Sequence, residues 1–277
     1  MSTLRVLLPA PPAPGRADAW ALFDDAGRVV ERGRGGAERW PASTHREAVL
    51  AAALVRVVAL KLPPMPASRV AAAAHYALED RLAATGEAPA VGLSAPQPDG
   101  LVVAAIVARA TLDAIDATKA RFDRVIAEPT LAPIAAGWTW YASGSGGGFV
   151  RTGEGGAFAV AHVPGDGALP PELAAALTQA GRRGEAPREV IVAERCSPDT
   201  LAAWRQATGV PFVAGEPWHW DSASAAAFAA APDLAGRSDA PVEAPRDRWR
   251  VFRPALAVAA AALLLHIVAT LAQWSWL

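Results

Sequence analysis

Side chains able to perform acid–base, nucleophilic or metal chemistry are scattered in this 277-residue sequence. The histidines do not stand at the spacing of a zinc site, and Cys196 is the only cysteine. Asp221 fits the N-cap of a following helix. His75 and Glu79, one helical turn apart, fit a solvated helix face better than an acid–base pair. We therefore predict no catalytic residue, no metal site, no cofactor and no enzymatic activity.

The glycine-rich stretch 144–148 invites comparison with a phosphate-binding loop. It lacks the Gly-Lys-Ser/Thr ending of a P-loop and the Gly-x-Gly-x-x-Gly spacing of a dinucleotide site. No Gly-x-Ser-x-Gly nucleophile elbow surrounds Ser143 or Ser145. The stretch predicts a flexible hairpin loop.

Composition limits the partners and the compartment. The net charge is −1 and no basic block lies outside a short stretch near residue 250, which argues against nucleic acid as a partner. A single thiol suits a reducing compartment. The apolar run Val6–Leu8 is too short for the core of a signal peptide.

Residues 254–276 have the composition of a transmembrane helix. This stretch contains no Asp, Glu, Lys or Arg, and as a helix it is about 34 Å long, which spans the hydrocarbon layer with slight tilt. Trp274 and Trp276 fit one interfacial belt, and Trp249 and Phe252 lie near the other. The alternative is a buried helix of a soluble core, but such helices rarely run this long without a charge.

Basic residues on one flank predict the orientation of this helix. The N-terminal flank carries Arg246, Arg248, Arg250 and Arg253, whereas no cation follows the span. The positive-inside rule then places residues 1–234 in the cytoplasm of a bacterial cell, with 235–253 as a linker and basic flank. Only Leu277 follows Trp276, so we expect an inner-membrane protein with one span, a cytoplasmic N-terminus and no periplasmic domain in this sequence.

One stripe of the predicted span combines small and polar residues at helical spacing. Its members are Ala255, Ala259, Ala262, His266, Thr270 and Gln273. Small residues allow close helix approach, and polar ones can hydrogen-bond across a helix pair. We expect this stripe to pair with a second transmembrane helix, either of a second copy or of a partner. The open alternative is a chance pattern in an alanine-rich helix.

The pattern before the membrane segment is α/β with mixed sheets. Short apolar runs between turn residues predict strands at 19–23, 28–32, 55–60, 91–94, 101–108, 124–128, 138–142, 148–151, 157–162, 189–193 and 210–213. Helical periodicity predicts helices at 66–83, 111–122, 171–180, 198–207 and 221–231. Residues 46–62 fit a helix or a helix followed by a strand. Hairpins at 19–32 and 138–162 suggest an internal duplication.

Three motifs in this order resemble the type II secretion system protein L family. They are Leu62-Pro63-Pro64-Met65-Pro66 leading into the helix that ends Leu78-Glu79-Asp80-Arg81-Leu82-Ala83, then Val150–Gly153 with Gly156–Val160, and then Trp249–Leu256. Together they cover about half of the chain. The resemblance implies an actin-like (RNase H-like) cytoplasmic domain in two or three subdomains. It also implies a secretion ATPase (the E component) and the M component as partners.

Two departures from the family pattern affect what the resemblance implies. The periplasmic ferredoxin-like domain is missing, so contacts made through it are not expected here. The Asp-x-Gly at Asp25–Gly27 lies in the first hairpin, while the second hairpin has glycines and no aspartate to hold a metal. Nucleotide binding is therefore not carried over.

The leading functional hypothesis is a membrane scaffold that recruits the secretion ATPase without chemistry of its own. The exposed side of the 66–83 helix, with Arg69, Glu79 and Arg81, is the candidate surface for that partner. The rival hypothesis is a membrane-tethered actin-like ATPase or assembly regulator, which would need Asp25.

Overall fold

The computed structural model describes residues 2–236, except 12, 14, 80–87, 119 and 163–166. Contacts group residues 1–237 into one compact unit, separate from 238–277. The predicted span 254–276, its pairing stripe and its arginine flank lie outside the described residues. Among the residues described, no helix is both long and apolar enough to cross a bilayer.

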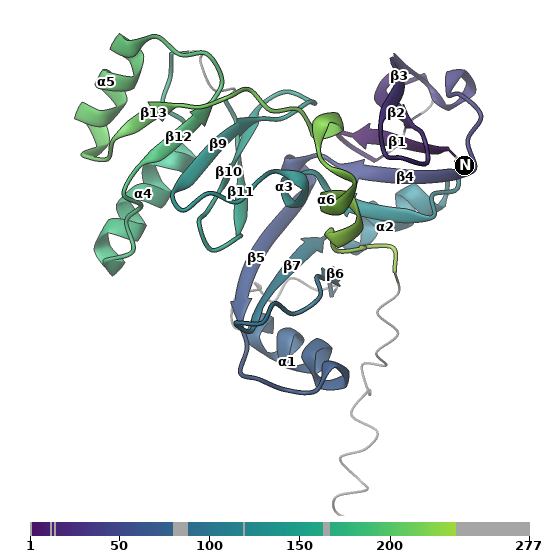
Figure 1. The fold of residues 1–277 in the computed structure, drawn as a ribbon, viewed down its shortest axis with the longest axis horizontal. Coiled ribbons are helices and arrows are strands. Elements are labelled where there is room, and N and C mark those ends of the chain that lie inside the picture. The colour runs from purple at the N-terminus through teal and green to yellow at the C-terminus, as the bar shows by residue number, and fades with distance from the viewer. Residues whose placement is uncertain are drawn as a thin grey trace, which may run out of the picture. The chain divides into compact units, whose positions relative to one another are not determined.

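The first sheet has five strands in the order β3-β2-β1-β4-β8 (Figure 1). The strands are β1 (Thr3–Leu8), β2 (Asp18–Phe23), β3 (Val29–Gly35), β4 (His45–Leu50) and β8 (Arg124–Ala127). Strands β1, β2 and β3 are antiparallel to one another, whereas β4 is parallel to β1 and β8 is parallel to β4. Apolar residues of β1 and β4 are almost fully buried because both strands lie inside the sheet.

The second sheet repeats this arrangement. In β9 (Trp138–Ala142), β10 (Gly148–Arg151) and β11 (Ala157–Val160) the strands are antiparallel, and β12 (Val190–Ala193) and β13 (Phe212–Ala214) add in parallel beside β9. The order β11-β10-β9-β12-β13 therefore matches β3-β2-β1-β4-β8 strand for strand. The suggested internal duplication is confirmed in topology.

A three-stranded antiparallel unit extends the second sheet beyond β11. It consists of β5 (Val55–Lys61), β7 (Leu101–Val107) and β6 (Ala90–Leu93), and it joins the repeat through the pair Ala157 and Val57. Helix α1 (Ala67–Glu79) packs its apolar face on this unit, with Val70, Ala74 and Leu78 buried. This helix confirms the periodicity predicted for 66–83 over its described part.

The other helices cover the sheets or link them. Helices α4 (Pro171–Arg183) and α5 (Pro198–Thr208) pack on the second repeat, where Trp140, Trp204 and Phe212 are in edge or tilted contact. The short helices α2 (Arg109–Asp116) and α3 (Glu128–Leu131) lie before and after β8. The 3₁₀ turns are η1 (Ala37–Arg39), η2 (Ala52–Leu54) and η3 (Trp220–Ser222), the last followed by α6 (Ala225–Ala230).

Three sequence predictions are wrong. The first half of 46–62 is not a helix but strand β4, whose charged start at His45–Glu47 hides the strand pattern. Strand β1 was not predicted at all, because its apolar run is short and buried inside a sheet. The predicted helix 221–231 is split into η3 and α6. Ser224, and not Asp221, caps α6 by accepting a hydrogen bond from the Ala227 amide at 3.1 Å. The Asp221 carboxylate instead pairs with Arg32 of β3.

A buried charge cluster fixes the C-terminal part of the described chain to the first sheet. Glu47 of β4 accepts hydrogen bonds from Arg5 of β1 at 2.7 Å and from Arg124 of β8 at 3.1 Å. The Arg5 guanidinium lies 3.6 Å from the ring centroid of Phe228 in α6. Arg124 also donates to the carbonyl oxygens of Phe228 and Ala231. Three strands and α6 therefore share one electrostatic contact.

Candidate functional site

The β9–β10 turn, residues 143–147, is tied to the first sheet by one carboxylate. Glu128, directly after β8, is fully buried. Its Oε2 accepts hydrogen bonds from the Ala52 amide at 3.1 Å and the Ser143 hydroxyl at 2.6 Å, and its Oε1 accepts one from the Gly144 amide at 3.0 Å. Burial raises the pKa of Glu128, and these hydrogen bonds act in the opposite direction. The carboxylate therefore joins three segments that are distant in sequence.

The same turn is closed on its other side by apolar side chains. A Cβ atom at Gly144 would lie 2.8 Å from Leu7 of β1 and 2.8 Å from Trp220 of η3, so only glycine fits this close approach. The turn is thus held by specific contacts and is not the unconstrained loop that its glycine content predicts.

These contacts decide what the turn can bind in the described conformation. A phosphate-binding turn presents free backbone N–H groups and no negative charge. Here the Gly144 amide is already used by a carboxylate, and Leu7 and Trp220 fill the adjacent space. This turn therefore does not offer a phosphate site in the described conformation.

The duplication corrects the placement of Asp25. Strand order pairs the β9–β10 turn with the β1–β2 loop, residues 9–17, and pairs the β2–β3 turn that holds Asp25 with the β10–β11 turn. The predicted first hairpin, 19–32, is therefore β2–β3, the second hairpin of the first repeat, because strand β1 was not predicted. Residues 9–17 contain no acid, and their one charged residue, Arg16, pairs with Asp18 at 2.6 Å. Asp25 therefore does not lie at the position equivalent to the β9–β10 turn.

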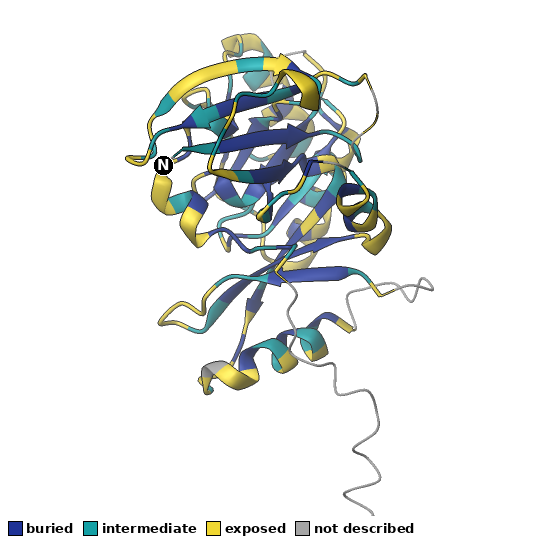
Figure 2. Cartoon of the chain, turned by 90° about the vertical axis from the view of Figure 1, so that its right-hand side faces the viewer, coloured by how far each residue is buried: buried dark blue, intermediate teal, exposed yellow. Residues whose placement is uncertain are grey.

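Helix α1 presents a mixed outer surface (Figure 2, bottom helix). Arg69 and Glu79 are exposed as predicted, about 15 Å apart along the axis, and Tyr76 between them is 77% exposed. Sequence reasoning did not single out Tyr76, although an aromatic residue opposite the Val70–Leu78 face was the available signal. Arg81 lies outside the described residues, and whether this surface binds a partner stays a prediction.

Two buried charged residues were also missed as site residues. Glu128 sits at the end of a predicted strand, and Arg151, at the end of β10, is only 4% exposed. A charged residue inside an apolar strand pattern was the signal for both. Among the described residues, no group of three or more His, Cys, Asp or Glu side chains could hold a metal ion.

The repeated five-strand order and the helices that cover it make this an α/β domain of mixed sheets, as predicted. No family model and no curated protein sequence match the chain. The cytoplasmic domain of EpsL, an inner membrane component of the type II secretion system of Vibrio cholerae, is similar in structure. Its TM-score is 0.50 at 16% identity, over 79% of this chain and 89% of that chain.

Two further solved structures are similar to the chain. The PilM–PilN type IV pilus biogenesis complex matches with a TM-score of 0.50 at 12% identity, over 78% of this chain and 88% of that one. A Bacteroides thetaiotaomicron protein of actin-like ATPase fold and unknown function matches with a TM-score of 0.43 at 9% identity, over 83% and 94%. At such identities the likeness concerns the fold alone.

Proposed function

We propose that this chain is a non-enzymatic scaffold of a type II secretion or related pilus-assembly machine, which recruits the cytoplasmic secretion ATPase to the inner membrane. The fold likeness to a membrane component of such a system supports the proposal. The observation that supports a non-enzymatic role is the β9–β10 turn. There the Gly144 amide already donates to Glu128, and Leu7 and Trp220 fill the space that a phosphate would need.

The proposal assigns ATPase binding to the outer face of α1. The apolar face of this helix is buried on β5, β6 and β7, so its orientation is fixed by the core. The opposite face offers one large aromatic side chain, Tyr76, between a cation and an anion at Arg69 and Glu79. Aromatic and arginine side chains are the types that dominate binding energy in protein interfaces.

The proposal assigns membrane attachment to residues 254–276. In it, the arginines of 246–253 keep the N-terminal region on the cytoplasmic side, and the stripe from Ala255 to Gln273 pairs with the M component or a second copy. Attachment and recruitment together would place the ATPase at the membrane surface.

The test of the ATPase surface is capture of the cognate secretion ATPase by the full chain reconstituted in lipid nanodiscs. We expect Tyr76→Ser combined with Arg69→Glu to weaken binding by about tenfold or more, because both substitutions remove side chains from the contact. The matched control is Arg182→Glu, which makes the same charge change on the exposed end of α4. Undiminished capture by the double variant would remove α1 as the docking face, and no capture by the unaltered chain would refute recruitment itself.

The rival actin-like ATPase hypothesis makes the opposite prediction for nucleotide. We expect Mg-ATP to leave the melting temperature of the full chain unchanged, because a ligand stabilises only the state that binds it. An upward shift that grows with the Mg-ATP concentration would favour the rival.

A further inference from the structure

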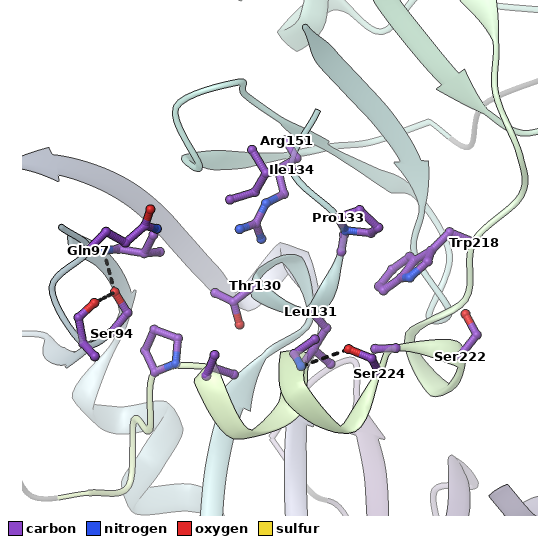
Figure 3. Close-up of a pocket in the computed structure, with 18 residues that line it drawn as sticks. Ser94, Gln97, Thr130, Leu131, Pro133, Ile134, Arg151, Trp218, Ser222 and Ser224 are labelled. Carbon is purple, nitrogen blue, oxygen red and sulfur yellow. Dashed lines mark hydrogen bonds between the residues drawn. The ribbon is translucent and has the colours of Figure 1, made fainter. Parts of the chain in front are cut away.

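A cavity in the described part of the chain lies apart from the β9–β10 turn and from α1. Its volume is about 630 Å³, within the range of small-molecule sites. It is lined by the β6–β7 turn, by α3 and the residues after it, by the end of β10, and by the segment from Trp218 to Pro232 (Figure 3). Strand β10 belongs to the second repeat and α3 follows the first, so the cavity lies where the two repeats meet.

Arg151 brings a positive charge to the wall of this cavity. It is the last residue of β10, its side chain is 4% exposed, and its guanidinium points into the cavity (Figure 3). Nη1 donates a hydrogen bond to the carbonyl oxygen of Pro129, while the buried Nε has no partner. Within the part of the chain that the structure describes, no carboxylate forms an ion pair with this guanidinium.

Burying the charged Arg151 side chain without an anionic partner is energetically unfavourable. Burial lowers the pKa of Arg151 to about 10, and interaction with Tyr141 opposes that shift, so the side chain stays charged at neutral pH. A buried cation without an anion loses hydration that no ion pair replaces. One carbonyl hydrogen bond leaves most of the donors of a guanidinium unused. The two arginines that hold the first sheet, the buried Arg5 and the partly buried Arg124, differ in this respect, since both pair with Glu47.

The rest of the wall is mainly apolar. Val103, Leu131, Ile134 and Trp218 contribute hydrocarbon surface. The polar side chains of Thr130, Ser94, Ser222 and Ser224 are already engaged with nearby backbone groups. Gln97, at the exposed rim, can turn its amide toward an entering group. An occupant therefore meets one fixed positive charge within an apolar enclosure.

We propose that this cavity binds a small ligand with an apolar body and a single carboxylate or phosphate group, and that the anionic group pairs with the Arg151 guanidinium. The planar fork of arginine matches either anion with two parallel hydrogen bonds. The apolar body packs against Ile134, Leu131 and Trp218. This ligand site goes beyond the proposed scaffold function and does not depend on it.

The test uses the full chain in nanodiscs and calorimetric titration with hexanoate, hexyl phosphate and the uncharged hexanamide, with empty nanodiscs as the blank. We expect at least one anion to bind with millimolar or better affinity, and at least tenfold more tightly than hexanamide. The better anion tells whether carboxylate or phosphate is preferred. If neither anion exceeds hexanamide, the site does not exist and Arg151 serves only to hold Pro129.

Two variants locate the binding. Arg151→Met should lose the preference for the anion, about tenfold or more, because the paired charge is gone. Since this variant also frees the Pro129 carbonyl and can fail to fold, Ile134→Trp is the second variant, which fills the cavity from its rim and leaves Arg151 in place. Val30→Trp, at a 64% exposed position on β3, adds the same indole elsewhere and should bind like the unaltered chain. Equal anion binding by Ile134→Trp and Val30→Trp would overturn the assignment.

Discussion

Removing the Glu128 carboxylate should destabilise the chain at a defined place, the junction of Ala52, Ser143 and Gly144. In Glu128→Ala the buried Ala52 amide and the buried Ser143 hydroxyl lose their acceptor, and each such loss costs about 1–3 kcal/mol. The Gly144 amide is at an exposed residue and can turn to water, so it adds little. Release from burying a carboxylate offsets part of the loss. We expect a net decrease of about 2–4 kcal/mol in the free energy of unfolding.

The assay is urea unfolding of the full chain, combined with amide hydrogen exchange at residues 52 and 143–147. The matched control is Glu154→Ala, which deletes an exposed carboxylate in the β10–β11 turn and should leave both measurements unchanged. Faster exchange in Glu128→Ala should be concentrated at the three hydrogen-bonded segments. If Glu128→Ala were as stable as Glu154→Ala, the carboxylate would not be the tie between the sheets.

Three other perturbations test the buried contacts of Glu128, Glu47 and Gly144. Burial raises the pKa of Glu128, so the folded chain holds this proton more tightly than the unfolded chain does, and the free energy of unfolding should fall as pH rises from about 4.5 through the raised pKa. Glu128→Gln should flatten this part of the stability–pH curve. An identical slope in the variant would argue against burial of Glu128 as the cause. Glu47→Ala should lower the free energy of unfolding by about 3–5 kcal/mol, since the buried Arg5 and the partly buried Arg124 lose their anion, whereas Glu31→Ala on the exposed side of β3 should change it very little. Gly144→Ala should lower the free energy of unfolding by about 1–3 kcal/mol through the clash with Leu7 and Trp220, measured by thermal melting. Gly181→Ala in α4, where a Cβ meets no neighbour, is the control and should leave the melting temperature unchanged or raise it.

Local pattern was enough wherever local contacts decide the structure. Aromatic residues on both sides of a glycine turn predicted β9 and β10 at their observed bounds. A 3.6-residue apolar period predicted α1 and α5, and α5 begins, as such helices do, with Ser197 as N-cap and Pro198 in its first turn. These elements carry their signal within about 15 residues.

The rest depended on partners far away in sequence. Strand β4 contains Glu47, which suits a helix locally, but Arg5 and Arg124 neutralise it from 42 and 77 residues away. Missing β1 shifted the first repeat by one hairpin and gave Asp25 a position that belongs to residues 9–17. Glu128 and Arg151 acquire their roles only when both sheets have formed, so neither stood out in the linear sequence.

The most direct test of the account is the amount of secretion ATPase that sediments with lipid vesicles carrying the full chain, measured beside the ATP hydrolysis of those vesicles before the ATPase is added. The account predicts saturable ATPase binding that bare vesicles do not show, and no hydrolysis above bare vesicles from the chain alone. ATPase binding no greater than that of bare vesicles, or ATP turnover by the chain without its partner, would contradict it.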